Sequence, residues 1–335
     1  LREKRGDLIG IALKEGGKSP LEADPEISEA IDFADYYAHS LQKNSKFQEI
    51  DFSPKGTILI TPPWNFPISI PVGGILAALS QGNCVLFKPA PEAVLCGWMI
   101  ANFLWEAGIP KEVLQFIPCR DDPEGSALIK DPRVNGVILT GATSTAKLFL
   151  DMRPSLDLFA ECGGKNALII TDLSDRDLAI KDLVHSAFGH SGQKCSAASL
   201  AIVEAPVYDD PRFWEHLKDA TESLKIGTAW HLSSKIVPLI RPPSPQLLKG
   251  LTTLDEGESW LVKPKKHPSY PNLWSPGIKM GVKESSFMHQ TELFGPVLGI
   301  MRAKNLSHAL HLANSTPYGL TAGIHTLDER EKKKW

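Results

Sequence analysis

Cys195 stands in the segment GQKCSAAS, among residues that suit a reactive thiol. A cysteine becomes a nucleophile when nearby N–H groups or a cation favour the thiolate and when small neighbours leave the sulfur accessible. Gly192 and Lys194 offer this kind of setting. The general alternative is a buried structural cysteine, which is the more common role of an unpaired cysteine. We therefore take Cys195 as a candidate nucleophile that needs partners elsewhere in the chain.

Glu161 and Asn65 are the residues that would complete such a site. Glu161 lies in AECGGKN, where apolar neighbours and two glycines predict partial desolvation, which raises the pKa of a carboxyl group towards that of a general base. Asn65 lies in PPWNFP, where prolines restrict the backbone, so that its amide N–H can be held as an oxyanion donor. The alternatives are a solvated or salt-bridged glutamate and an asparagine that bonds turn carbonyls.

The segments that position these residues alternate between apolar runs rich in β-branched residues and helical patterns. The predicted strands are 56–62, 84–89, 113–118 and 134–141, and the predicted helices are 25–42 and 91–107. Such alternation is typical of a parallel sheet covered on both faces. We predict an α/β protein, with a Rossmann-type doubly wound nucleotide-binding domain at 1–161 and a second α/β domain at 162–335 that carries the cysteine.

Ligands of open parallel sheets bind at the carboxyl ends of the strands. PPWNFP, KPA and TGATS follow three of the predicted strands, so we expect these loops to share one site. The fingerprint G-x-G-x-x-G is absent, and the nearest element is the junction at 140–144. A helix N-terminus there can bind a phosphate, although many such junctions are simple N-caps.

The second domain has fewer sharp signals. Ser174, with Asp177 three residues later, predicts the start of a helix by a capping box. Strands are predicted at 166–172, 200–205, 292–301 and 319–326, and helices at 211–225 and 305–313.

Composition excludes several classes of function. With 36 basic and 39 acidic residues, the chain has no basic excess to bind nucleic acid or an anionic membrane. Its most apolar stretch, 66–79, is too short to span a bilayer and contains two prolines, so it is predicted to be buried core. Five irregularly spaced cysteines fit a reducing cytoplasm and show no zinc-ligand spacing, so no metal is expected. Cys84, Cys96 and Cys119 are assigned to structural roles.

Five motifs carry a resemblance to a known family. PPWNFP, LFKPA, AECGGKN, GQKCSAAS and ELFGPV occur in this order, and the chain resembles the aldehyde dehydrogenase superfamily over essentially its whole length. Family members are normally longer at both ends, and the polar first residues and the final EREKKKW look like cut ends, so a fragment is expected.

The resemblance implies specific roles. Cys195 is the nucleophile, Asn65 and the Cys195 backbone N–H form the oxyanion hole, and Glu161 activates the hydrolytic water. The cofactor residues that it implies are Lys88 for the adenosine ribose, Gly141, Ala142, Thr143 and Ser144 for the pyrophosphate, Glu292 for the nicotinamide ribose, Phe294 beside the nicotinamide, and Pro63 and Trp64.

Some positions depart from the family pattern. Many members have Ser where Ala142 stands, and Pro91 separates KPA from Glu92, which leaves the choice between NAD and NADP open, with NAD preferred. Cys162 replaces a more usual Leu or Thr, without a functional account.

Finer features resemble one branch of the family. RGDLIG (5–10), EGGK (15–18), ADPEISEAIDFADYYA (23–38) and TELFGPVLGIMRA (291–303) are similar to L-glutamate γ-semialdehyde (Δ1-pyrroline-5-carboxylate) dehydrogenases, as in bacterial bifunctional proline-utilisation proteins. This implies proline catabolism, a fused or separate proline dehydrogenase as partner and a homo-oligomer in the full-length protein. The implied substrate residues are Phe66, Ser196, Ala322 and Gly323, the last two in a glycine-rich loop, with a simple strand bend as the alternative.

Three alternatives stay open. The first is a dehydrogenase for another semialdehyde, such as succinate semialdehyde. The second is an inactive, truncated dehydrogenase-like domain, against which the presence of Cys195, Glu161 and Asn65 argues. The third is a thiol hydrolase, for which no histidine can be placed beside Cys195 from the sequence.

Overall fold

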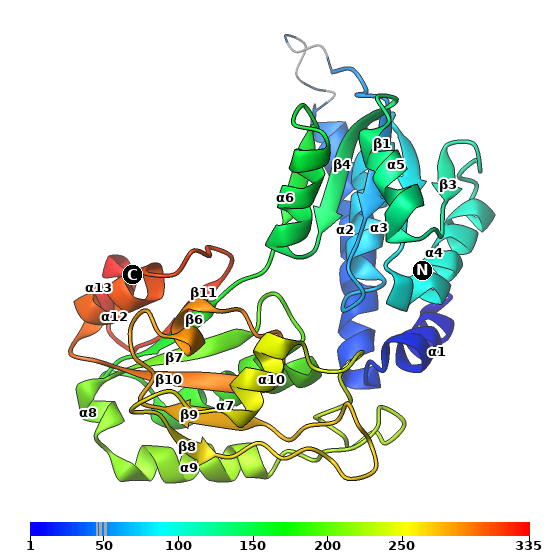
Figure 1. Ribbon diagram of the computed structural model, residues 1–335. Helices are drawn as coiled ribbons and strands as arrows, with labels where there is room; N and C mark the ends of the chain where they lie inside the picture. The colour runs from blue at the N-terminus through cyan, green and yellow to red at the C-terminus, as the bar shows by residue number, and fades with distance from the viewer. Residues whose placement is uncertain (45, 47–48, 50–51) are drawn as a thin grey trace. The chain divides into compact units, whose positions relative to one another are not determined.

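The computed structural model describes residues 1–44, 46, 49 and 52–335 and divides into two compact units, Leu1–Cys162 and Gly163–Trp335 (Figure 1). We call them unit 1 and unit 2 and describe each by itself. The division falls one residue beyond the boundary expected from the sequence, and the functional roles of the two units stay predictions.

Unit 1 is built on a five-stranded sheet in the order β3-β2-β1-β4-β5, in which every neighbouring pair is parallel. Its strands are β1 (Thr57–Thr61), β2 (Cys84–Phe87), β3 (Leu114–Phe116), β4 (Val134–Thr140) and β5 (Leu158–Glu161). This is the strand order of a Rossmann-type sheet, which binds ligands where the order reverses, here between β1 and β4. The predicted fold class is confirmed.

Helices cover both faces of this sheet. They are α1 (Arg5–Gly16), α2 (Pro20–Asn44), α3 (Ser69–Ser80), α4 (Val94–Glu106), α5 (Ser126–Lys130) and α6 (Thr143–Met152). Strand side chains alternate between faces, so Ile58 and Ile60 pack in the cluster formed with α1 to α4, whereas Leu59 packs with residues of α5 and α6. Most of the apolar stretch 66–79 forms α3, buried as predicted.

The predicted start of α2 at residue 25 is wrong. The helix begins at Pro20, and Pro25 lies inside it. A proline at the first helical position costs little, because the N–H that it lacks would have no partner within the helix.

Unit 2 contains a six-stranded sheet in the order β11-β6-β7-β10-β9-β8. All neighbouring pairs are parallel except β8 and β9. The strands are β6 (Asn166–Ile170), β7 (Ala198–Glu204), β8 (Ser259–Val262), β9 (Gly277–Met280), β10 (Val297–Ala303) and β11 (Ala322–His325). The helices are α7 (Arg176–Phe188), α8 (Ala205–Tyr208), α9 (Pro211–Glu222), α10 (Pro245–Thr252), α11 (Phe287–Gln290), α12 (Leu306–Asn314) and α13 (Glu329–Lys334).

Several predicted element ends in unit 2 differ from the structure, and two of the differences have a clear cause. The strand expected from residue 292 begins at Val297, because the backbone of Phe294 turns with a φ of 53°. Helix α7 is capped by Asp175, whose Oδ1 accepts from the Leu178 N–H at 3.0 Å, rather than by Ser174. A carboxylate with access to the free N–H groups of the first turn is an equally good cap.

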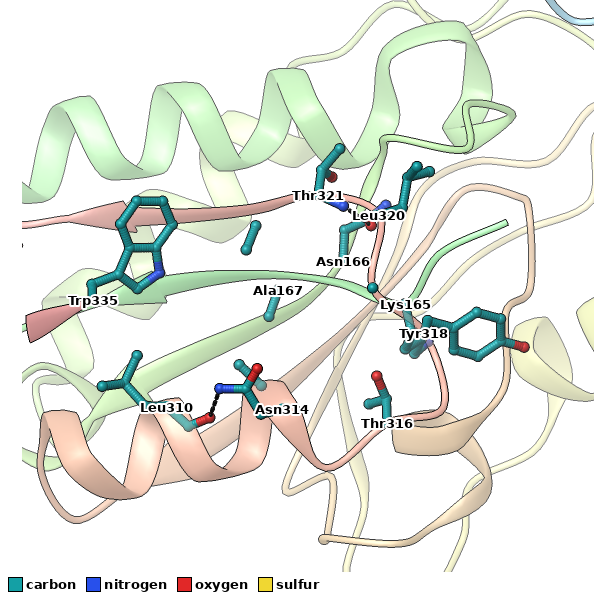
Figure 2. A pocket seen from close by; sticks show the side chains of 13 residues that line it. Lys165, Asn166, Ala167, Leu310, Asn314, Thr316, Tyr318, Leu320, Thr321 and Trp335 are labelled. Atoms are coloured by element: carbon teal, nitrogen blue, oxygen red, sulfur yellow. Dashed lines mark hydrogen bonds between the residues drawn. The ribbon is translucent and has the colours of Figure 1, made fainter. Parts of the chain in front are cut away.

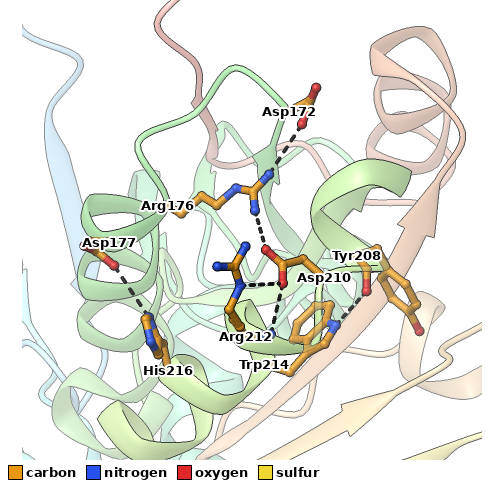
Figure 3. A network of polar contacts seen from close by, with 8 residues as sticks. All are labelled: Asp172, Arg176, Asp177, Tyr208, Asp210, Arg212, Trp214 and His216. Atoms are coloured by element: carbon orange, nitrogen blue, oxygen red, sulfur yellow. Dashed lines mark hydrogen bonds and ion pairs between the residues drawn. The ribbon is translucent and has the colours of Figure 1, made fainter.

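The starts of α7 and α9 are tied together by Asp210 (Figure 3). Asp210 Oδ1 accepts from the Arg212 backbone N–H at 3.1 Å, and its Oδ2 lies 2.6 Å from the guanidinium of Arg176. Beside it, the Trp214 indole donates to the Tyr208 carbonyl at 2.6 Å. This network fixes the helix layer on one face of the sheet. Among the described residues, none of the helices has the length and apolarity that a membrane crossing requires.

Candidate active site

The loop that carries Asn65 begins where β1 ends, at the reversal of strand order in unit 1. Asn65 is 4% exposed, and Pro63 and Trp64 before it are half-buried. The Lys18 ammonium donates to the Asn65 carbonyl at 3.0 Å. The prolines around Asn65 predicted a rigid loop. The structure adds a second cause, because the buried ammonium of Lys18, from a distant segment, also bonds the Asn65 backbone.

The junction after β4 forms the second loop at this edge. Ala142 is the N-cap of α6 and makes no side-chain capping bond. The first residues of the helix, Thr143 and Ser144, are exposed, so a phosphate can reach the backbone N–H groups of the first turn. The Gly141 N–H donates to the Glu161 carbonyl at 3.0 Å, which places this junction beside the end of β5.

Lys88 follows β2 at the same edge, and its backbone N–H donates to the Ile60 carbonyl at 3.0 Å. The side chain is 9% exposed, and its ammonium lies 2.6 Å from Oδ1 of Asp121, which is 77% exposed. Asp121 was not singled out in the sequence, since 33 residues separate it from Lys88. A ribose bound at Lys88 has to share the ammonium with this carboxylate.

Glu161 is the last residue of β5 and is exposed. The expectation that apolar neighbours desolvate it is wrong, because the strand presents its last three residues to solvent. A carboxylate that activates water needs access to water, so this exposure is compatible with the expected role, although it removes the argument from burial.

In unit 2, Cys195 lies in a tight turn that the Ala197 N–H closes by donating to the Lys194 carbonyl at 3.0 Å. The Asn166 amide group donates to the Cys195 carbonyl at 2.6 Å and to the Ala197 carbonyl at 2.9 Å. Cys195 is half-buried and Ser196 is exposed. Asn166 was missed in the sequence, although it ends the motif AECGGKN.

The backbone that leads to this turn is held in an unusual conformation. His190 and Ser191 have φ values of 48° and 56°, in the left-handed region that L-residues seldom adopt. The Ser191 hydroxyl donates to the Val237 carbonyl at 2.6 Å and accepts from the Val237 N–H at 2.9 Å. These bonds stabilise the strained segment and therefore the position of the thiol.

Glu292 reaches the segment before β6. Its Oε1 accepts from the Gly164 N–H at 3.0 Å, and a Cβ on Gly163 would lie only 2.1 Å from its Oε2. Any side chain at position 163 would therefore have to displace the Glu292 carboxylate. Burial raises the pKa of Glu292, and the Gly164 N–H and the charge of Lys165 act in the opposite direction.

The Cys195 turn and the Glu292 segment are neighbours within unit 2. A Cβ on Gly192, whose φ is 71°, would lie 2.3 Å from the Gly295 carbonyl oxygen. Phe294 stands between Glu292 and Gly295, with its own positive φ. Segments 163–166, 190–196 and 292–295 are thus packed together, as expected for parts of one site.

The residues predicted to form a glycine-rich substrate loop lie in a strand instead. Ala322 and Gly323 are in β11, paired with Ala167 and Leu168 of β6, so they form regular strand rather than a loop. Just before β11, the Thr321 N–H donates to Asn166 Oδ1 at 3.1 Å. Asn166 therefore bonds both the Cys195 turn and the segment that enters β11.

A pocket of about 320 Å³ lies beside β11, lined by residues of β6, α12 and the segment before β11 (Figure 2). Lys165 is among its lining residues. Its ammonium has no hydrogen-bond partner among the described residues, and burial lowers the pKa of Lys165 to about 7.

The remaining cysteines and possible metal ligands add nothing to the site. Cys96 is buried, as assigned, but Cys84 is exposed, so the structural role predicted for it by burial is wrong. Burial raises the pKa of the Cys119 thiol. Within the described part of the chain, no group of three or more His, Cys, Asp or Glu side chains is placed to hold a metal ion.

Comparison with known proteins agrees with this geometry. The family model "Aldehyde dehydrogenase family" matches residues 1–335. A 1-pyrroline-5-carboxylate dehydrogenase of Staphylococcus saprophyticus is 32% identical over 97% of this chain, which spans 66% of that relative's length.

Solved structures give the same picture. Proline utilization A from Corynebacterium freiburgense superposes with a TM-score of 0.97 at 46% identity, covering 100% of this chain and 34% of the other. A 1-pyrroline-5-carboxylate dehydrogenase from Thermus with bound NAD superposes with a TM-score of 0.90 at 30% identity, covering 99% of this chain and 68% of the other. With all five motifs of the sequence placed on a Rossmann-type unit and a cysteine-bearing α/β unit, the chain belongs to the aldehyde dehydrogenase family.

Proposed function

We propose that the chain catalyses the NAD-dependent oxidation of L-glutamate γ-semialdehyde, the open form of Δ1-pyrroline-5-carboxylate, to L-glutamate. The observation that carries the proposal is the convergence on Asn166, which bonds the turn of Cys195 and the segment before β11 while its neighbour Gly164 bonds Glu292. The identity of relatives named for 1-pyrroline-5-carboxylate supports the choice of aldehyde.

In this proposal Cys195 is the nucleophile. Its thiolate adds to the aldehyde carbon, a C–S bond forms, and the carbonyl electron pair becomes an alkoxide. The Asn65 side-chain amide and the Cys195 backbone N–H donate to this oxygen, a contribution worth about 10²–10³ in rate for one donor. Covalent attachment divides a difficult oxidation into two easier steps.

NAD, when bound, accepts the hydride of the attached aldehyde carbon. The residues of the chain fit such a group: the exposed first turn of α6 suits the pyrophosphate, and Lys88 and Glu292 suit the ribose hydroxyls. Ala142 has no hydroxyl to add, so the backbone N–H groups of the first turn and the exposed hydroxyls of Thr143 and Ser144 would make the phosphate contact.

Glu161 completes the cycle. After oxidation the acyl group is a thioester on Cys195, and Glu161 takes a proton from a water molecule that attacks the carbonyl carbon. The C–S bond breaks, the carboxylate product leaves and the thiolate returns. The exposure of Glu161 leaves a path for the water.

Three parts of the chain are proposed to recognise the substrate. Ser196 is exposed next to the nucleophile and can bind the α-carboxylate, and Phe66 packs on the aliphatic part. Ala322 and Gly323 lie in an edge strand and would offer the substrate only backbone groups that do not pair with β6, so we expect them to contribute least to substrate binding.

The wider context is also part of the proposal. A proline dehydrogenase, fused or separate, would supply the substrate, and the enzyme would act in the cytoplasm as a homo-oligomer. All five cysteines are free thiols, which suits a reducing compartment.

The test is an assay of NADH formation with Δ1-pyrroline-5-carboxylate and, separately, with succinate semialdehyde. We expect kcat/KM to be at least about tenfold higher for the first, because succinate semialdehyde lacks the α-amino group and its carboxylate lies one carbon nearer the aldehyde, so that polar groups placed for the longer substrate are left unpaired. Glu161→Gln should leave an acylated Cys195 that mass spectrometry detects. Equal use of both aldehydes would overturn the substrate, and absence of the acyl-enzyme would overturn the role of Glu161.

A further inference from the structure

A buried ion pair lies beneath the Asn65 loop. Lys18 follows α1 and Glu26 lies on α2; their side chains are 1% and 0% exposed, and Nζ lies 2.6 Å from Oε2. Both residues precede β1, and beyond the bond from Lys18 to Asn65 neither has a part in the site as described so far. A pair so buried loses much hydration energy, which its mutual attraction repays only when further hydrogen bonds satisfy both groups.

Three further hydrogen bonds of the pair go to the segment 65–69. The Lys18 ammonium donates to the Asn65 carbonyl at 3.0 Å and lies 3.8 Å from the centroid of the Phe66 ring. The free edge of the Glu26 carboxylate, Oε1, accepts from the Ile68 N–H at 2.7 Å and from the Ser69 N–H at 3.1 Å.

The pair therefore bonds the segment 65–69 near both of its ends. Lys18 holds the carbonyl side of Asn65, and Glu26 holds the amides at the start of α3, where a negative charge also interacts favourably with the helix dipole. The N-cap residue of α3 itself, Ile68, makes no side-chain hydrogen bond to the amides of the first turn. Glu26 of α2 replaces the local cap, and Lys18, from the connection between α1 and α2, holds the backbone on the other side of Phe66.

Unit 2 contains a second buried ion pair, which bonds a segment away from the proposed site and so serves for comparison. Lys279 lies 3.3 Å from Glu258, with both side chains 2% exposed. The Lys279 ammonium donates to the Thr253 carbonyl at 2.6 Å, which belongs to a connection after α10. This pair contacts none of the residues assigned to the reaction.

We propose that Lys18 and Glu26 are positioning residues that hold the Asn65 amide in place for the alkoxide and the Phe66 ring in place for the substrate chain. The inference rests on the proposed function, since it assigns the pair to the oxyanion donor of that reaction. Positional errors of about 1 Å in such a donor can lower the rate about 10²-fold.

The sharpest variant is the double change Lys18→Met with Glu26→Gln. It removes both charges together, so no unpaired charge stays buried, and the glutamine oxygen can still accept from Ile68 and Ser69. What it deletes is the donor to the Asn65 carbonyl and the cation over Phe66. Lys279→Met with Glu258→Gln is the matched control.

We expect kcat for Δ1-pyrroline-5-carboxylate to fall about 10- to 100-fold in the first double variant, with the Kd for NAD and the rate of Cys195 alkylation by iodoacetamide within about twofold of wild type. The control should keep its kcat. In an Asn65→Ala background, the Lys18 and Glu26 changes should lower kcat by less than about a further twofold, because their effect on kcat acts through the same amide, whereas the displacement of Phe66 is expected in KM. Full additivity in this background, or an unchanged kcat in a folded variant, overturns the inference.

A cofactor-independent readout separates this inference from the proposed function. Acylation of Cys195 by p-nitrophenyl acetate also passes through a tetrahedral oxyanion, so it should slow about tenfold or more in the first double variant and in Asn65→Ala. A wild-type chain that is acylated but oxidises no semialdehyde would refute the function and leave the positioning role supported. Equal acylation of wild type and variant would refute the positioning role. If the double variant fails to fold, Lys18→Leu with Glu26→Gln is measured instead, since it also removes both charges and the donor to the Asn65 carbonyl, and the same outcomes are expected.

Discussion

The two segments assigned to the reaction are held by different chemistry. In unit 1, a buried lysine and glutamate bond the backbone around Asn65. In unit 2, a neutral amide, Asn166, bonds the carbonyls of the Cys195 turn. A thiolate is stabilised by N–H groups and is disfavoured by a nearby negative charge. Because the Asn166 amide, here called the neutral clamp, carries no charge, it does not change the stability of the Cys195 thiolate. The groups that hold Asn65 can be charged, because an amide does not titrate.

The comparison also extends to glycine. In unit 2, Gly163 and Gly192 let segments approach so closely that any Cβ would clash. In unit 1, Gly10 faces open space inside α1. A single methyl group added at Gly163 or Gly192 should therefore be felt in the segments that carry Glu292 and Cys195.

The largest effect should come from the nucleophile in unit 2. Cys195→Ala is expected to lower kcat by about 10⁴-fold or more, because no covalent intermediate can form. NAD binding, followed by fluorescence titration, should change less than about threefold. Residual turnover near that of wild type would transfer the nucleophile to another cysteine.

A smaller effect is expected from crowding the ribose carboxylate. Gly163→Ala places a methyl group on the position of Glu292 Oε2 and should weaken NAD binding about 10- to 100-fold, the cost of one displaced charged hydrogen bond. Gly10→Ala is the control and should leave affinity unchanged. Equal affinities for wild type and Gly163→Ala would mean that Glu292 does not contact the cofactor.

Changing the neutral clamp into a charged one tests the comparison directly. Asn166→Asp cannot donate to the Cys195 and Ala197 carbonyls and brings a negative charge to the turn, so the pKa of the Cys195 thiol should rise. We expect kcat/KM to fall about tenfold and the pH profile of alkylation to move to higher pH.

The control for this change is Asn314→Asp on α12, where an exposed amide donates to the Leu310 carbonyl at 2.9 Å. It should leave both measurements as in wild type. If the pH profile of Cys195 alkylation were the same for Asn166→Asp and wild type, the absence of charge at position 166 would not matter for the thiolate.

The smallest effect concerns pH and stability. Burial lowers the pKa of Lys165 from 10.5 to about 7, with the carboxylate of Glu292 opposing and the charge of Lys279 adding to the shift. Between these values the unfolded chain binds more protons than the folded one, so this lysine makes the free energy of unfolding rise with pH, by about 1 kcal/mol from pH 6 to pH 8. Lys165→Met should lose that rise in denaturant titrations, and a slope equal to that of wild type would place the Lys165 titration elsewhere.

Much of this protein was set by local sequence. Alternating apolar runs predicted the parallel strands of both units, since strand and helix periods are local properties. The residue types around Cys195 and Asn65 indicated their possible chemistry, the role of Glu292 followed only from the family resemblance, and a strand-to-helix junction was predicted at 140–144, where α6 begins. Element ends were less accurate, as Pro20 and Asp175 show, because several residues nearby can cap a helix equally well.

Only the tertiary structure decided which residues hold those motifs in place. Lys18 lies 47 residues from Asn65 and Asn166 lies 29 from Cys195, and no local pattern links a side chain to a backbone carbonyl so far along the chain. Burial was decided in the same way: Glu161 and Cys84 have apolar neighbours in sequence but end at exposed positions. Solvent exposure depends on what packs against a residue in three dimensions, whereas residue type and spacing are written in the chain itself.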